Sequence, residues 1–139
     1  MFALIRHAGY QIGNGSLTPD GVAESLGLAE SLRQLGPWTE LRASPSSRTM
    51  ETAAIIAKTL AIPMTADDRI GMDGDLSDLL PPTEPHGLIF VSHLPILSRW
   101  LRFWSKAFDM EEPPITDIAC GYLIDTEART ILQVRPLLK

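Results

Sequence analysis

Apolar residues along the chain alternate between short continuous runs and longer stretches with helical spacing. The first run, Phe2–Ile5, is apolar at every position, which is typical of a strand that helices cover on both faces. Further strands are expected at Leu41–Ala43 and Leu88–Val91. This pattern predicts a parallel sheet in which the first strand is central.

Three helices are predicted to alternate with these strands. The first covers Leu17–Leu35, because Thr18 can cap its start and the Gly36-Pro37 pair ends it. Its apolar spacing predicts a buried stripe made of Val22, Leu26, Ala29, Leu32 and Leu35. The other two helices are expected at Thr49–Leu60 and Leu94–Phe108.

The remaining apolar segments predict the outer strands of the sheet. Pro63–Ile70 indicates an edge strand, and Gly121–Asp125 and Thr130–Val134 indicate a pair of strands. The alternation of strands and helices is typical of a layered α/β fold. At 139 residues the chain is long enough for one core, so we expect a single domain over residues 1–139.

Composition narrows the classes of function. Twelve Lys and Arg residues against seventeen Asp and Glu residues give a formal net charge of −5, which disfavours binding to nucleic acids or anionic membranes. The single cysteine, Cys120, is expected to be a small buried residue in a reducing compartment. No secretory leader or membrane-spanning stretch is recognisable, so a cytoplasmic location is expected.

Polar side chains follow three of the predicted strands. Arg6 and His7 come directly after the first strand, Arg48 ends the turn after the second, and Ser92 and His93 follow the third. In open parallel sheets, ligands bind beyond the carboxyl ends of the strands, so these side chains are expected to converge. Two of the strand ends lead into helices, whose first-turn N–H groups favour an anion, and Arg offers a fork of donors to phosphoryl oxygens. The sequence therefore predicts a phosphoryl-binding site.

Four sequence blocks carry a resemblance to a known family. In order, they are "LIRHA", "LTPDGVAES", "SPSSRTMETA" and "VSHLP". They resemble the histidine phosphatase superfamily, the phosphoglycerate mutase-like branch of phosphoryl-transfer enzymes, and are most similar to its SixA-type phosphohistidine phosphatases. The resemblance implies a three-layer α/β/α sandwich with a mostly parallel central sheet. Ala8 is one departure, since many members have glycine after the Arg-His pair.

The resemblance also implies roles for individual residues. His7 would be the nucleophile that takes the phosphoryl group as a covalent phosphohistidine, Arg6 and Arg48 would bind its oxygens, and His93 would stabilise its charge. Ser92 is a further candidate for substrate binding. The chemistry agrees, because a neutral imidazole is a competent nucleophile near pH 7. Neither a metal nor another cofactor is expected, since two arginines in one pocket would repel a cation.

Other polar residues near the four blocks have alternative roles. Ser44, Ser46 and Ser47 could contact phosphate or cap the adjacent helix, and Asn14 could do the same or form a turn. His86 lies between Pro85 and Gly87, matches none of the blocks, and is expected at the surface.

The general acid is the role without a clear residue. Family members that cleave esters place a carboxylic acid beside the leaving group. The nearby candidates are Asp73, Asp75 and Asp78, of which Asp73 and Asp75 are preferred, and each could equally cap a local turn. A phosphohistidine nitrogen can instead be protonated from solvent. With no sizeable inserted cap visible, we expect an enzyme that removes phosphate from phosphohistidine of a partner protein. A phosphatase of small phosphorylated metabolites and a catalytically silent phosphate-binding module are the alternatives.

Overall fold

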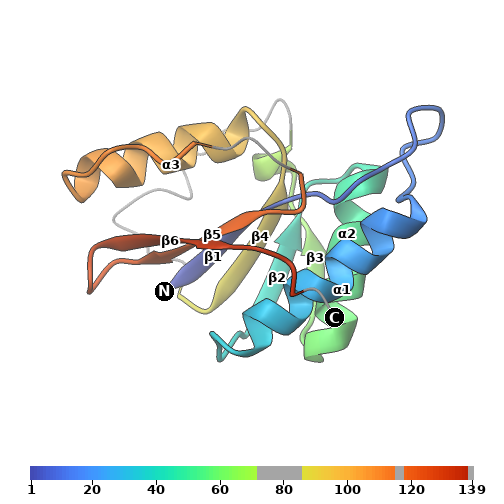
Figure 1. Cartoon of the computed structure of the whole chain (residues 1–139), viewed down its shortest axis with the longest axis horizontal. Coiled ribbons are helices and arrows are strands. Elements are labelled where there is room, and N and C mark those ends of the chain that lie inside the picture. The colour runs from blue at the N-terminus through green and yellow to red at the C-terminus, as the bar shows by residue number, and fades with distance from the viewer. Residues whose placement is uncertain (72–85, 115–117, 138–139) are drawn as a thin grey trace.

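The computed structural model describes residues 1–71, 86–114 and 118–137. Within these ranges six strands form one sheet in the order β3-β2-β4-β1-β5-β6 (Figure 1). The strands are β1 (Phe2–Arg6), β2 (Glu40–Ala43), β3 (Met64–Ala66), β4 (Leu88–Ser92), β5 (Gly121–Asp125) and β6 (Thr130–Val134). The helices are α1 (Pro19–Arg33), α2 (Ser47–Leu60) and α3 (Ile96–Ala107), with a short 3-10 helix η1 (Asp68–Ile70) after β3.

The central position predicted for the first strand is confirmed. β1 pairs with β4 in parallel on one side and with β5 in antiparallel on the other. β2 is parallel to both β3 and β4, whereas β5 and β6 form an antiparallel pair. The parallel part of the sheet therefore places the carboxyl ends of β1, β2 and β4 at one edge.

Helices cover both faces of this sheet. Ala3 and Ile5 of β1 belong to a core shared with α1 and α2, while Phe2 and Leu4 face a second core under α3. Figure 1 shows α1 and α2 together on one side of the sheet and α3 on the other. The expected three-layer α/β/α sandwich is thus confirmed. No helix in the described ranges is long and apolar enough to span a bilayer.

The buried face of α1 differs from the predicted stripe. Ala29 and Leu32 are fully buried as predicted, but Val22 and Leu26 are 40% and 46% exposed. Ser25 and Leu28 are fully buried in their place. Small residues cause this rotation, because they allow backbone to approach the helix closely. A Cβ on Gly21 would lie 2.0 Å from the carbonyl oxygen of Gly9, a separation that no real Cβ atom shows. Such backbone contacts cannot be predicted from the spacing of hydrophobic residues.

The predicted edge strand at Pro63–Ile70 is right for three residues only. β3 ends at Ala66, and the buried Asp67 then starts η1 by accepting a hydrogen bond from the Arg69 backbone N–H at 3.0 Å. The Arg69 guanidinium holds the same carboxylate at 2.8 Å. This side-chain interaction ends the strand, since it favours a turn over continued pairing with β2.

Candidate active site

The parallel pairing of β1 with β4 places His7 beside His93. Arg6 is in register with Ser92, and the His7 backbone N–H donates to the Ser92 carbonyl at 3.3 Å. The two imidazole rings meet edge to face with their centroids 5.8 Å apart. Ser44 joins them from the end of β2, where its N–H donates to the Val91 carbonyl at 3.0 Å. Three strand ends therefore converge, as the sequence predicted.

A hydrogen bond to the backbone places the proton of the neutral His7 ring on Nδ1. Its side chain is only 5% exposed, and Nδ1 lies 3.0 Å from the carbonyl oxygen of Ala8. Because a carbonyl oxygen only accepts, Nδ1 carries the proton in this contact. In the neutral ring Nε2 then holds the lone pair, as a nucleophilic nitrogen must.

The surroundings of His7 favour its neutral form. Burial lowers its pKa below the ordinary value of 6.5, and the nearby guanidiniums of Arg48 and Arg6 lower it further. The hydrogen bond to Ala8 acts in the opposite direction without reversing the shift. The imidazole is therefore held in its neutral form more strongly than a free histidine.

His93 is held by Ser44. Its Nε2 lies 2.6 Å from the Ser44 hydroxyl oxygen, and both side chains are buried. Burial, followed by the charges of Arg48 and His7, lowers the pKa of His93 to about 4. A neutral His93 has one proton, which can lie on either nitrogen, and the Ser44 hydroxyl can donate to Nε2 or accept from it.

Two arginines complete the cluster. Arg6 ends β1, and Arg48 lies in the first turn of α2, where its guanidinium carbon is 4.9 Å from the centre of the Tyr10 ring. In the described part of the chain, no acceptor pairs with the buried Nε atoms of Arg6 and Arg48 or with Nδ1 of His93. Buried polar groups of this kind are costly unless they are paired. The cluster is therefore complementary to an anion.

The start of α2 is fastened to the segment that follows His7. The Ala8 N–H donates to the Thr52 hydroxyl at 3.1 Å, and that hydroxyl donates to the Arg48 carbonyl at 2.7 Å. Ser46 contributes to the helix start, because its N–H and hydroxyl both contact the Thr49 hydroxyl oxygen, at 3.3 and 2.6 Å. Arg48 and His7 are thus held at a fixed separation.

Tyr10 is a residue of the site that the sequence reasoning missed. Its ring meets the His7 ring edge to face at 5.2 Å and stacks with the Arg48 guanidinium. The side chain is 38% exposed, so it forms the boundary between the cluster and solvent. The only signal in the sequence is an aromatic residue three positions after His7, which the helical and strand patterns do not single out.

The other predicted polar residues divide between structural roles and the surface. Ser92 is fully buried and donates its hydroxyl proton to the Ile70 carbonyl at 2.6 Å, so that proton is not available to a phosphoryl oxygen. Asn14 forms a turn by accepting from the Ser16 N–H at 2.9 Å. His86 is exposed, with Nδ1 3.0 Å from the amino group of Met1.

The candidate general acids Asp73, Asp75 and Asp78 lie outside the described residues. Across residues 1–71, 86–114 and 118–137, no group of three or more His, Cys, Asp or Glu side chains is arranged to hold a metal ion.

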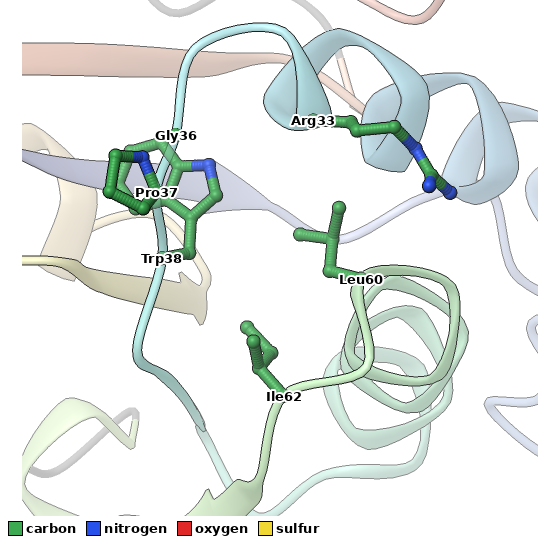
Figure 2. Close-up of a pocket in the computed structure, with 6 residues that line it drawn as sticks. All are labelled: Arg33, Gly36, Pro37, Trp38, Leu60 and Ile62. Carbon is green, nitrogen blue, oxygen red and sulfur yellow. The ribbon is translucent and has the colours of Figure 1, made fainter.

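A separate hollow of about 370 Å³ lies at the opposite end of β2 (Figure 2). Pro37 and Trp38, just before β2, lie across from Leu60 and Ile62 after α2. Arg33 at the end of α1 also borders it. None of the strand-end residues of the cluster lines this hollow, so it is distinct from the site around His7.

Comparison with known families points to the histidine phosphatases, in agreement with the fold and with the cluster around His7. The model of the histidine phosphatase superfamily (branch 1) matches residues 4–71, a range that holds Arg6, His7 and Arg48. The matched range holds three of the four sequence blocks, and together with the shared fold it confirms the resemblance and supports a hydrolase. No curated protein matches the chain.

Solved structures share the fold over nearly the whole chain. The protein histidine phosphatase SixA complexed with tungstate is 21% identical, with a TM-score of 0.73 over 97% of this chain and 96% of its own. A phosphohistidine phosphatase SixA described from Agrobacterium tumefaciens is 18% identical, with a TM-score of 0.67 over 99% and 97%. A phosphoserine phosphatase of Entamoeba histolytica in complex with 3-phosphoglyceric acid is 14% identical, with a TM-score of 0.62 over 99% and 96%.

The low pKa of His93 predicts how stability depends on pH. The folded group has a pKa of about 4 and the unfolded one about 6.5, so the unfolded chain binds more protons between these values. Stability is therefore fully present above about pH 6.5 and falls as the pH drops toward 4, and His7 contributes in the same direction. Thermal melts between pH 7.5 and 4.5 measure this, and His93→Asn should flatten the slope.

The exposed His86 provides the control for this measurement. His86→Asn should keep the slope of the wild-type protein. A melting temperature that rises on acidification from pH 7 to 5, or equal slopes in wild type and His93→Asn, would contradict the assignment.

Proposed function

We propose that this protein is a phosphatase that removes phosphate from phosphohistidine of a partner protein through a covalent intermediate on His7. The observation that carries the proposal is the hydrogen bond from Nδ1 of His7 to the Ala8 carbonyl, which leaves the Nε2 lone pair available. The unpaired Nε donors of Arg6 and Arg48 support it, since they suit a phosphoryl group. Tungstate in the related SixA structure is likewise a tetrahedral oxyanion.

In the first step, the Nε2 lone pair attacks phosphorus. A bond from Nε2 to phosphorus forms, and the bond from phosphorus to the substrate imidazole breaks. The imidazole leaves in its neutral form, because its other ring nitrogen has taken a proton from solvent and the departing nitrogen keeps the electron pair of the broken bond. Arg6 and Arg48 stabilise the charge on the transferring oxygens, and His93 adds a donor when the Ser44 hydroxyl donates to its Nε2 and leaves the proton on Nδ1.

In the second step, water replaces His7 on phosphorus. In the phosphorylated ring Nδ1 keeps its proton, which is hydrogen-bonded to the Ala8 carbonyl oxygen. The ring therefore carries positive charge and is a good leaving group. Water forms the new bond to phosphorus, the bond to Nε2 breaks, and the water proton passes to solvent. Inorganic phosphate leaves and His7 returns to its starting tautomer.

The leaving group decides between the two substrate classes. An ester oxygen departs as a poorly stabilised alkoxide unless an acid protonates it, whereas an imidazole protonated from solvent departs neutral. The proposal of a phosphohistidine substrate therefore rests on its leaving group, which needs no dedicated carboxylic acid.

The covalent intermediate is tested on His7. Rapid mixing with labelled phosphoramidate should leave label on the protein that is stable in alkali and lost in acid, because a phosphoramidate bond is acid-labile. His7→Ala should abolish labelling and turnover while keeping the fold, since His7 belongs to neither of the two apolar cores. His86→Ala serves as the matched control and should label normally. Acid-stable label, or label on Ser44, would contradict the mechanism.

The role of Arg48 is tested by keeping its charge and changing its shape. Arg48→Lys should lower kcat/KM for phosphoramidate at least tenfold, about 1.4 kcal/mol, because an ammonium reproduces neither the two-pronged contact nor the stacking on Tyr10. Arg33→Lys, at an exposed position on α1, is the control and should keep full activity. Unchanged activity in Arg48→Lys would remove Arg48 from contact with the phosphoryl group.

Substrate preference is tested by comparing two leaving groups. Phosphohistidine and phosphoramidate should be hydrolysed much faster than glycerol phosphate. Asp73→Asn and Asp75→Asn should each lower the phosphoramidate rate by less than tenfold, under about 1.4 kcal/mol of barrier. Comparable rates on both substrate types, with a collapse of ester hydrolysis in either variant, would identify a general acid and favour the small-molecule phosphatase instead.

A further inference from the structure

An ordered loop projects beside the catalytic cluster. Residues 9–17, here called the rim loop, leave the end of β1 and extend beyond α1 and α2 (Figure 1). Two backbone hydrogen bonds close the loop, from Gln11 N–H to the Ser16 carbonyl at 2.7 Å and from Gly15 N–H to the Gln11 carbonyl at 2.9 Å. Ile12 lies within this closed turn with its side chain 95% exposed.

Helix α2 and a β-bridge hold the rim loop in place. Tyr10 and Leu17 form an antiparallel bridge at its base, and the Leu17 N–H donates to the Glu51 carboxylate at 3.4 Å. Gly15 lies against α2, where a Cβ at this position would be 3.4 Å from Cβ of Ser47. The exposure of Ile12 is therefore a property of a defined conformation.

Two further exposed apolar side chains lie at the base of the rim loop. Tyr10, which contacts the ring of His7 and the guanidinium of Arg48, is 38% exposed. Ile118 is 37% exposed and covers Gly9, since a Cβ on that glycine would lie 3.4 Å from its Cδ1. Single exposed apolar residues are common on protein surfaces, but Tyr10 and Ile118 lie beside the segment that carries His7, and Ile12 follows Tyr10 by two residues.

We propose that Ile12, with Tyr10 and Ile118, forms a docking surface for a phosphorylated polypeptide that carries apolar side chains near its phosphohistidine. This inference rests on the proposed function. The phosphoryl group binds the cationic cluster, while the residues around the phosphohistidine bury Ile12. A free metabolite phosphate occupies only the space next to His7, whereas Ile12 projects two residues beyond Tyr10, up to about 7 Å further along an extended chain.

The partner presents apolar side chains to this surface, because the exposed tip of the rim loop is apolar. Burying an isoleucine that is nearly fully exposed removes most of its surface from water, a gain that a polar partner surface would not provide. The loop is already ordered by its backbone hydrogen bonds, so little conformational entropy is lost when a partner binds.

Two synthetic phosphohistidine peptides of equal length test this inference. One carries leucine on both sides of the phosphohistidine, and the other carries serine at the same positions. Wild-type protein should hydrolyse the leucine peptide with a kcat/KM about fivefold or more above that of the serine peptide. Ile12→Ser should reduce this ratio to about twofold or less and leave phosphoramidate hydrolysis unchanged. Leu132→Ser, which removes another exposed apolar side chain on β6, should keep the wild-type ratio.

Each remaining outcome overturns the inference in a recognisable way. Equal hydrolysis of the two peptides by wild type, or a preference that survives in Ile12→Ser, would overturn the docking surface and leave the phosphohistidine activity standing. Failure to hydrolyse either peptide while glycerol phosphate is cleaved would overturn the proposed function and, with it, this inference. A dimer in solution that Ile12→Ser abolishes would assign the surface to a second copy of the chain instead.

Discussion

The site depends on the register in which β1 and β2 each pair with β4, the strand between them. This pairing places Arg6 opposite Ser92 and Ala43 opposite Val91, so the residues that follow each strand meet at one level of the sheet. A slip of one residue would turn every side chain of a strand to the opposite face. Because β1 is buried on both faces, such a slip would expose apolar residues, and the packing of the core therefore fixes the positions of His7 and His93.

The cost of this convergence is electrostatic. Two half-buried arginines lie beside two buried histidines, and burial together with the arginine charges lowers the pKa of both histidines. The repulsion is limited because the histidines remain neutral, while the arginines keep their charge. Burial and the two arginine charges make the empty cluster unfavourable. The same two factors favour a bound anion and keep a nitrogen lone pair on each histidine.

The sequence predicted the layers of the fold, the order of its elements and the convergence of Arg6, His7, Arg48 and His93, because these depend on strand ends and local patterns. It did not predict Tyr10 in the site or the rotation of α1, since both arise from contacts between segments distant in the chain. Ser92 was assigned to substrate, yet its hydroxyl donates to Ile70, a residue in another element. The catalytic roles, the single domain, the cytoplasmic location and the general acid stay predictions.

The oxygen that fixes the tautomer of His7 belongs to the main chain. Only substitutions that move the backbone can therefore change this hydrogen bond. No side-chain replacement at residue 8 deletes the Ala8 carbonyl, so the tautomer depends on the path of the backbone after β1. That path is held by Gly9, whose N–H donates to Glu24 at 3.0 Å and whose carbonyl touches Gly21. Selection on the tautomer of His7 therefore extends to the first turns of α1, which lie outside the cluster of arginines and histidines.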